Sequence, residues 1–455
     1  MTPKLIAHSL KSRLENMTTD CQKRPWNKTL AIWAFAVIVL GVIFSACTNE
    51  SRQDGILEIK FWAMGREGEI VPDLLEEFEG ENPGVRVLVQ QVPWSAAHEK
   101  LLTAFVGDSL PDVAQMGNTW ISEFAALNAL SRLDELAKAS PVIEEQDYFP
   151  GIWATNRIDD SLFGVPWYVD TRLLFYRQDI LRNAGIGRPP RDWAEWMQAV
   201  TAVKQHVGES NFALFVPVND VEMQVSLALQ QDVPLLREGN RYGNFSSPEL
   251  VAALDFYLDF FRKGLAPASS ESAISNVWDE FARGYFTFYL TGPWNIGEFR
   301  RRLPADLQDD WMTAILPGPS GPGASTAGGS SLVVFEDSAH KDAAFRLVEF
   351  LSRPDVQQRF YELSGNLPPR RASWGGDRLE SDPYVAAFRE QLERVLPAPK
   401  VPEWERIVQE LRTVTERAVH KQWTAAETAR ELDSRIDRIL EKRRWLLAQN
   451  RGGES

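Results

Sequence analysis

The feature that most constrains the fold is an alternation of strand and helix patterns near the start of the chain. Apolar and charged residues alternate in the segments typical of strands, and apolar residues recur at helical spacing between them. The predicted strands are 56–62, 85–89 and 111–116, and the predicted helices are 70–78 and 93–105, the second with Ser95 as its N-cap. Short connections between such segments predict right-handed βαβ units and therefore an α/β fold with a parallel sheet.

Polar and aromatic residues follow the predicted strands at the ends where such sheets bind ligands. In open α/β sheets, ligands bind beyond the carboxyl ends of the strands. Trp62, Glu67 and the loop from Asn118 to Trp120 all fall at these ends. We therefore take Trp62, Glu67, Asn118 and Trp120 as candidate ligand contacts.

A second informative stretch is residues 164–177, which read Gly-Val-Pro-Trp-Tyr-Val-Asp-Thr-Arg-Leu-Leu-Phe-Tyr-Arg. Pro166 restricts the backbone around it to extended conformations, so the stretch predicts a strand. Trp167, Tyr168 and Asp170 combine flat aromatic faces with a carboxylate, which suits the apolar face and the hydroxyl rim of a sugar. A core strand with two aromatic rings packed inside fits the same residues, and the stretch alone does not decide between the two.

The later part of the chain adds one candidate contact and a helical end. A predicted buried strand leads to Gly292-Pro293-Trp294, where a tryptophan has few core neighbours and so favours ligand stacking. Trp193 and Trp196 have helical spacing and are interpreted as core residues. Residues 317–330 form a loop rich in Gly, Pro, Ser and Ala that lacks the lysine of a phosphate-binding loop. From Pro402 the pattern is helical to about residue 449.

Charge and cysteine content exclude several classes of function. The first 47 residues hold six Lys or Arg and two Asp or Glu, so the remainder carries 43 basic and 61 acidic residues, a net charge of −18. Such a surface repels phosphate backbones, and we expect no nucleic-acid partner. Both cysteines, Cys21 and Cys47, precede residue 48, so the body can form no internal disulfide. No His-Glu-x-x-His or Gly-x-Ser-x-Gly motif is present, and no metal, cofactor or catalytic site is predicted.

The N-terminal segment has the pattern of an export signal. A polar, basic region of 29 residues precedes the apolar run 30–44, which ends in Ser45-Ala46-Cys47. Ser-Ala-Cys resembles a bacterial lipobox, in which the cysteine is lipidated after cleavage, although Phe44 replaces the usual Leu. An uncleaved anchor helix is the alternative. Either way, we expect a periplasmic or extracellular body held at the cell membrane.

Several motifs in order carry a resemblance to a known family. They are Phe61-Trp-Ala-Met-Gly, Asn82-Pro-Gly, Pro93-Trp-Ser-Ala-Ala-His-Glu-Lys, Leu110-Pro-Asp-Val, Gly164-Val-Pro, Gly292-Pro-Trp, Gly328-Gly-Ser and Asn366-Leu-Pro-Pro-Arg. Together they resemble family 1 of the bacterial extracellular solute-binding proteins, the sugar-binding components of ABC importers related to maltose-binding protein. The resemblance extends from Ile56 to about Leu440.

The resemblance implies a two-lobed, type II periplasmic-binding-protein fold that closes on a mono- or oligosaccharide and presents it to a membrane permease. It implies ligand contacts at Glu67, Asn118, Trp120, Asp170, Trp294 and Arg370. The full set of predicted contacts adds Trp62, Trp167, Tyr168 and Gly328. By analogy, residues 1–47 are a signal peptide with a lipobox, 48–55 a linker, 56–167 and 329–364 lobe 1, 168–328 and 365–449 lobe 2, and 450–455 a tail. The hinge is expected near Pro166, Gly328 and Gly365, and the protein is expected to be a monomer that uses no cofactor.

Two other functions fit a cleft with aromatic rings and carboxylates. A secreted glycoside hydrolase would need two carboxyl groups about 5 to 9.5 Å apart across the scissile bond, and no such pair stands out in the sequence. A sugar sensor that docks on a receptor would share the binding site but not the permease.

Overall fold

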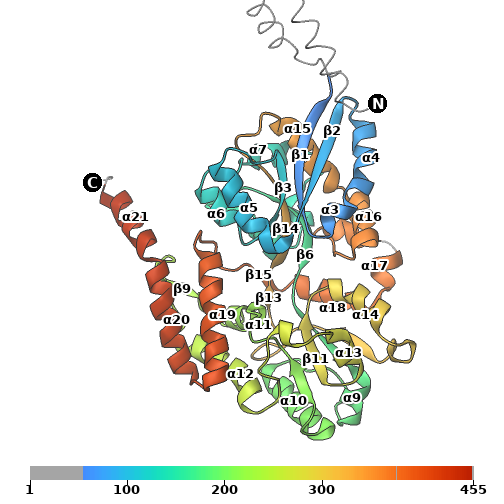
Figure 1. Cartoon of the computed structure of the whole chain (residues 1–455), viewed down its shortest axis with the longest axis vertical. Coiled ribbons are helices and arrows are strands. Elements are labelled where there is room, and N and C mark those ends of the chain that lie inside the picture. Colours follow the sequence, from blue (N-terminus) through green and yellow to red (C-terminus); the bar gives the residue numbers. More distant parts are fainter. Residues whose placement is uncertain (1–54, 376, 453–455) are drawn as a thin grey trace, which may run out of the picture. The chain divides into compact units, whose positions relative to one another are not determined.

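The computed structural model describes residues 55–375 and 377–452 (Figure 1). The predicted signal peptide, its Cys47 and nearly all of the predicted linker lie outside these residues. Within the described part of the chain, no helix combines the length and the apolar character needed to cross a bilayer.

The first sheet contains the predicted βαβ units. Its strand order is β2-β1-β3-β14-β6. The strands are β1 (Leu57–Met64), β2 (Val85–Val92), β3 (Val113–Gly117), β6 (Val165–Asp170) and β14 (Gly328–Val334). β1 runs parallel to β2 and β3, which confirms the prediction, whereas β14 runs antiparallel to β3 and to β6. The sheet is therefore mixed.

Helices bury both faces of this sheet. They are α3 (Glu67–Ile70), α4 (Pro72–Glu81), α5 (Trp94–Val106), α6 (Ile121–Ala126), α7 (Asp134–Ala139), α15 (Lys341–Leu351) and α16 (Pro354–Ser364). Residues of β1 alternate between two cores, since Phe61 and Ala63 belong to one core with Phe78, while Trp62 and Met64 belong to the other with Leu101. The prediction of Ser95 as N-cap is wrong, because Pro93 occupies the cap position and no side chain caps α5.

The second sheet has the strand order β12-β7-β11-β8. Its strands are β7 (Leu173–Arg177), β8 (Phe212–Phe215), β11 (Phe286–Thr291) and β12 (Trp311–Ala314). β11 is parallel to β8 and antiparallel to β7. Because β8 and β11 run in the same direction, their carboxyl ends meet at one edge of the sheet.

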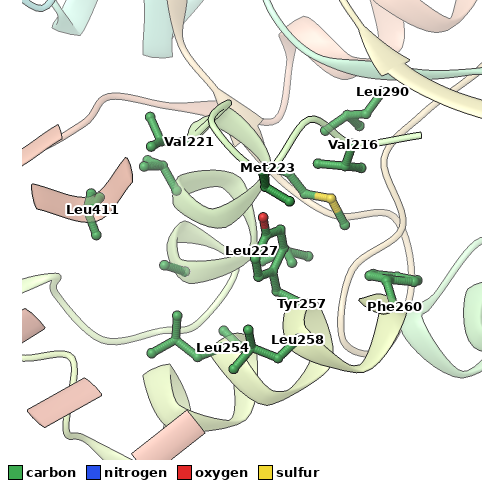
Figure 2. Close-up of a cluster of buried hydrophobic side chains, with 14 of the residues drawn as sticks. Val216, Val221, Met223, Leu227, Leu254, Tyr257, Leu258, Phe260, Leu290 and Leu411 are labelled. Atoms are coloured by element: carbon green, nitrogen blue, oxygen red, sulfur yellow. The ribbon is translucent and has the colours of Figure 1, made fainter. Parts of the chain in front are cut away.

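The helices around the second sheet include the C-terminal ones. They are α9 (Gln178–Asn183), α10 (Trp193–Val207), α11 (Glu222–Leu229), α12 (Pro248–Arg262), α13 (Val277–Ala282), α14 (Trp294–Arg302), α17 (Asp377–Ser381), α18 (Pro383–Leu392), α19 (Trp404–Lys421), α20 (Ala425–Ile439) and α21 (Glu441–Gly452). Figure 2 shows Met223 of α11 close to Tyr257 of α12 in an apolar core to which Leu411 of α19 also belongs. Trp196 is fully buried there, which confirms its predicted core role.

Short elements complete the described chain. They are α8 (Pro150–Ala154), β4 (Arg157–Ile158), β5 (Ser161–Leu162), β9 (Leu236–Arg237), β10 (Tyr242–Gly243), β13 (Ser325–Thr326), β15 (Val395–Leu396) and the 3₁₀ turns Glu145–Asp147, Glu271–Ala273, Ala305–Leu307 and Arg371–Trp374.

The stretch predicted as one strand, residues 164–177, forms two strands in different sheets. β6 pairs with β14 in the first sheet, and β7 pairs with β11 and β12 in the second. The chain therefore passes from one sheet to the other at Thr171 and Arg172, a few residues beyond the predicted boundary at 167.

The chain crosses between the sheets a second time at residues 325–328, and this second crossing lies directly against the first. Gly328 pairs with Asp170, and a Cβ atom on Gly328 would lie 2.1 Å from the Asp170 carbonyl oxygen. The Ser325 hydroxyl donates to the carbonyl of Arg172 at 3.0 Å and accepts from its amide at 3.3 Å. A third connection joins them, since the amide of Val169 donates to the carbonyl of Leu367 at 2.9 Å. Glycine at 328 is thus required by the close approach of two backbones.

Candidate functional site

A tryptophan lies within or just after the carboxyl end of each of the three parallel strands of the first sheet. Trp62 lies near the end of β1, Trp94 begins α5 after β2, and Trp120 precedes α6 after β3. The rings of Trp94 and Trp120 meet edge to face with centroids 5.8 Å apart, and Trp94 is 37% exposed. The Lys100 ammonium lies 4.5 Å from the Trp62 ring centroid. These rings give the strand ends an aromatic wall.

A glycine turn makes room for the second of these rings. Gly65 ends the β1 strand with φ +54°, and a Cβ atom there would lie 2.6 Å from the Trp94 ring. Trp94 was not among the predicted contacts. Its position after β2, equivalent to that of Trp120 after β3, is the signal that would have identified it.

Glu67 and Tyr168 supply polar groups on the same sheet. Glu67, the first residue of α3, accepts a 2.7 Å hydrogen bond from the Asn366 side-chain amide. The Tyr168 hydroxyl accepts a 3.1 Å bond from Gln115. Burial and the nearby Glu67 carboxylate raise the pKa of Tyr168 well above its ordinary value. Tyr168 is therefore a neutral hydroxyl that lies close to a carboxylate.

Asn118 and its neighbours fix the loop after β3. The Asn118 side-chain amide donates to the carbonyl of Ala327 at 2.6 Å, and the Thr119 hydroxyl donates to the Glu405 carboxylate of α19 at 2.7 Å. Asn118 is almost fully buried. Its side chain thus ties this loop to the second crossing, where it holds Trp120 in place.

Asp170, Arg172 and Trp294 come together where the chain passes between the sheets. An Arg172 amino group (Nη1) donates to the Asp170 carboxylate at 2.7 Å. The guanidinium carbon lies 4.6 Å from the ring centroid of Trp294, which is 40% exposed at the start of α14. The predicted exposure of Trp294 is therefore confirmed.

A pocket of about 500 Å³ opens beside this group, at the carboxyl ends of β8 and β11. Trp278 lies on its wall and donates from its indole nitrogen to Asn295 at 2.9 Å. The lining residues are Arg172, Pro217, Asp220, Val277, Trp278, Tyr289, Leu290, Thr291, Trp294, Asn295, Glu298 and Arg302. An aromatic pocket with two carboxylates, Asp220 and Glu298, has the chemistry for stacking on a ring and accepting hydrogen bonds from hydroxyls.

Trp167 does not reach this site. Its side chain is 1% exposed, stacks on Phe360 with centroids 4.6 Å apart and meets Phe61 at 5.9 Å. The interpretation of Trp167 as a stacking surface is corrected, because both rings belong to the core under the first sheet. In a strand buried on both faces, side-chain alternation does not tell which ring faces an opening.

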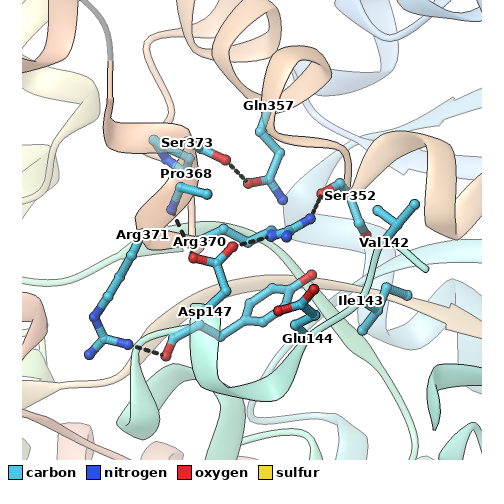
Figure 3. Close-up of polar contacts among 12 residues, drawn as sticks. Val142, Ile143, Glu144, Asp147, Ser352, Gln357, Pro368, Arg370, Arg371 and Ser373 are labelled. Atoms are coloured by element: carbon cyan, nitrogen blue, oxygen red, sulfur yellow. Dashed lines mark hydrogen bonds and ion pairs between the residues drawn. The ribbon is translucent and has the colours of Figure 1, made fainter. Parts of the chain in front are cut away.

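Arg370 is also part of the interior. It donates to the Asp147 carboxylate at 2.6 Å and to the carbonyl of Ser352 at 2.7 Å, and it is 6% exposed. Figure 3 shows its guanidinium between Asp147 and Ser352. The predicted ligand contact is corrected to a buried ion pair that joins residues 145–148 to the segment after α16.

Comparison with known proteins decides the family. A family model described as bacterial extracellular solute-binding protein matches residues 64–358. The chain belongs to this family. The sugar-binding protein MalE of Xanthomonas citri, a solved structure, is 52% identical to this solute-binding protein and superposes with a TM-score of 0.84; the match covers 86% of this chain and 99% of that one.

More distant relatives share most of the chain. The diacetylchitobiose binding protein DasA of Streptomyces coelicolor is 23% identical over 435 residues, which are 91% of this chain and 99% of that protein. The arabinooligosaccharide-binding protein of Bacillus subtilis is 23% identical over 370 residues, 78% of this chain and 83% of its own. The solved relatives are two-lobed periplasmic binding proteins, so the predicted two-lobed α/β fold is confirmed.

The described residues of this solute-binding protein thus form two candidate surfaces. The first sheet provides the exposed Trp94 and the half-buried Trp120, together with Trp62, Glu67 and Tyr168, which are each only 8–9% exposed, and Asn118 anchors the loop of Trp120. The crossing and the second sheet provide Asp170, Trp294, Trp278 and the pocket beside them, with Gly328 packed against Asp170.

Proposed function

We propose that this protein is the substrate-binding component of an ABC-type sugar importer. It captures a mono- or oligosaccharide between its lobes and delivers it to the membrane permease. The observation that carries the proposal is the arrangement of exposed tryptophans and carboxylates at the strand ends of both sheets. The 52% identity to a protein named as the sugar-binding MalE supports the same ligand class.

Binding is proposed to work by closure of the two lobes around the ligand. A saccharide that contacts both lobes stabilises only the closed form and so shifts the equilibrium toward it. The lobes are proposed as the predicted 56–167 with 329–364 and 168–328 with 365–449, except that residues 168–170 are assigned to the first lobe, because β6 pairs in the first sheet. The three crossings absorb the backbone rotation.

The ligand leaves chemically unchanged in this proposal. Trp62, Trp94, Trp120 and Trp294 provide stacking faces, while Glu67, Tyr168 and Asp170 exchange hydrogen bonds with hydroxyls. No covalent step is involved, and the family consists of binding proteins. The protein is proposed to act as a monomer.

A thermal-shift screen of the mature protein tests the proposal. The panel consists of glucose, maltose, trehalose, cellobiose, maltotriose and N,N'-diacetylchitobiose. A ligand at a hundred times its dissociation constant adds about 2.7 kcal/mol to the free energy of unfolding. A clear shift with at least one sugar is expected, and the same sugars should be recovered intact after incubation. Absence of any shift, or hydrolysis of the bound sugar, would contradict the proposal.

The N-terminal segment is proposed to be a lipoprotein signal that leaves a lipid on Cys47. Cys47→Ala should then release the processed protein from the membrane fraction or block its processing. An unchanged full-length protein in the membrane would instead indicate an anchor helix.

A further inference from the structure

Arg172 occupies a position that links the two predicted ligand contacts of the crossing. It lies between β6, which ends at Asp170, and β7, which begins at Leu173. Its guanidinium bonds to Asp170 at 2.7 Å and covers one side of the Trp294 ring at 4.6 Å. Its backbone is held on both sides by the Ser325 hydroxyl. Arg172 therefore has little freedom to leave either partner.

The surroundings of Arg172 are rich in carboxylates. Although burial acts to lower the pKa of Arg172, the carboxylates of Asp170, Asp220 and Glu222, together with the Tyr289 hydroxyl, raise it. Asp220 lines the pocket, and Glu222 accepts a 2.7 Å bond from the Thr326 hydroxyl. A cation at this point is thus held by acidic groups from β6 and from the segment that begins α11.

Burial lowers the pKa of an arginine but raises the pKa of the neighbouring carboxyl groups. It raises the pKa of Asp170, and Arg172 is the group that opposes this rise most strongly. Burial likewise raises the pKa of Glu222, and the charge of Arg172 acts to lower it. An ionised carboxylate accepts hydrogen bonds at both oxygens and donates none, whereas a protonated one has an O–H donor in place of part of that acceptor capacity. Loss of the arginine would therefore raise the pKa of Asp170 further.

We propose that Arg172 is a positioning residue for ligand binding, which holds the Asp170 carboxylate as an acceptor for sugar hydroxyls and holds the Trp294 ring in place. The role rests on the proposed function of the site. A cation fixed behind the acceptor fits a ligand that donates neutral hydroxyl groups to Asp170.

The experiment compares Arg172→Met, Arg172→Lys, Asp170→Asn and the Arg172→Met/Asp170→Asn pair. Each variant of the mature protein is titrated at pH 6 and pH 8.5 with the panel sugar that gives the largest wild-type shift. We expect Arg172→Met to weaken binding by about tenfold or more at pH 6 and by clearly less at pH 8.5, because higher pH favours the ionised form of Asp170. Arg172→Lys should restore a flat pH profile. The paired variant should bind weakly with no pH dependence.

A second measurement, the pH dependence of the unfolding temperature, tests the role of Arg172 in the ligand-free protein. In Arg172→Met, the folded-state pKa of Asp170 rises further above its unfolded value, so stability is full at low pH and falls as pH rises through the folded-state pKa. The unfolding temperature of the ligand-free protein should therefore fall more between pH 5 and pH 8 than that of wild type, and this excess should vanish in the paired variant. Arg262→Met is the matched control, because Arg262 joins Asp255 and Asp259 on the surface of α12.

The outcomes separate the two proposals. An equal loss of binding at both pH values, or a lysine variant that fails to restore the flat profile, would overturn the role of Arg172. So would an Arg172→Met protein whose ligand-free stability follows the wild-type pH profile. If no sugar binds to wild type, the proposed function fails, while the ligand-free measurement still decides whether Arg172 controls Asp170.

Discussion

The side-chain amide of Asn366 donates a 2.7 Å hydrogen bond to the Glu67 carboxylate, although the two residues are 299 positions apart. Glu67 begins α3 at the end of the first strand, and Asn366 follows Gly365, which ends α16 with φ +80°. Both side chains are about 9% exposed. The bond therefore fixes an acidic group at the predicted ligand surface from the segment that forms the third crossing.

Glu67→Gln tests whether this carboxylate binds the ligand. The amide has nearly the same shape but loses the charge that strengthens hydrogen bonds from hydroxyls. We expect saccharide affinity to fall by about tenfold, which is about 1.4 kcal/mol, while the ligand-free unfolding temperature changes little. Isothermal titration with the best panel sugar measures the first effect.

Glu79→Gln is the matched control for this change. Glu79 also accepts one hydrogen bond, from the amide of Val87 at 2.8 Å, but it belongs to α4 and lies outside the candidate site. Its replacement should leave affinity unchanged. Equal losses in both variants would mean that Glu67 acts through the fold and not through the ligand.

Trp294→Ala should reduce saccharide affinity, whereas Trp167→Ala should reduce stability. Trp294 is 40% exposed, so its loss should reduce saccharide affinity by at least about tenfold and leave ligand-free stability close to wild type. Trp167 is buried against Phe61 and Phe360, so its loss should cost about 3–5 kcal/mol of unfolding free energy. Urea denaturation and sugar titration of both variants check this. A stable Trp167→Ala protein that no longer binds sugar would restore the original interpretation of Trp167.

Arg370→Met should destabilise the protein without a specific effect on the ligand. The substitution leaves the Asp147 carboxylate, which is 16% exposed, without its cation. Removing one partner of a buried ion pair costs about 3–5 kcal/mol. The folded fraction should still bind sugar with wild-type affinity. Loss of affinity with unchanged stability would return Arg370 to the site.

Most of the first sheet could be predicted because its signals are local. The alternation in residues 56–62 and the helical spacing after Ile70 each reflect one element with one buried face. The break between β6 and β7 has no such signal. Asp170, Thr171 and Arg172 carry no proline or glycine, and the two strands separate only because Asp170 pairs with Gly328 and Leu173 with Thr291.

The exposure of a candidate residue could be predicted where it depends on position along the chain. It could not be predicted where it depends on packing against residues distant in sequence. Trp294 follows a Gly-Pro pair and is exposed as expected. Trp167 and Arg370 have residue types suited to a sugar, but their partners Phe360 and Asp147 lie far away in sequence. Only the folded chain shows that these partners occupy the ring face and the guanidinium.

The pairing of His98 with Glu123, beside the ring of Trp120, should make the free energy of unfolding depend on pH. His98 bonds to the Glu123 carboxylate at 2.7 Å, and its ring centroid lies 5.1 Å from that of Trp120. The hydrogen bond to Glu123 raises the pKa of His98, with further support from Glu405 and Glu99 and against partial burial.

A raised folded-state pKa stabilises the protein fully below the unfolded value of about 6.5, and the gain is lost as pH rises through the folded-state value. We therefore expect wild type to lose up to about 1 kcal/mol relative to Glu123→Gln between pH 5.5 and pH 8.5. Urea denaturation at the two pH values measures the difference, and His98→Asn should remove it as well. If the free energy of unfolding follows the same pH profile in wild type and both variants, the bond to Glu123 does not raise the pKa of His98. The His98 ring would then contribute to the site only by packing against Trp120.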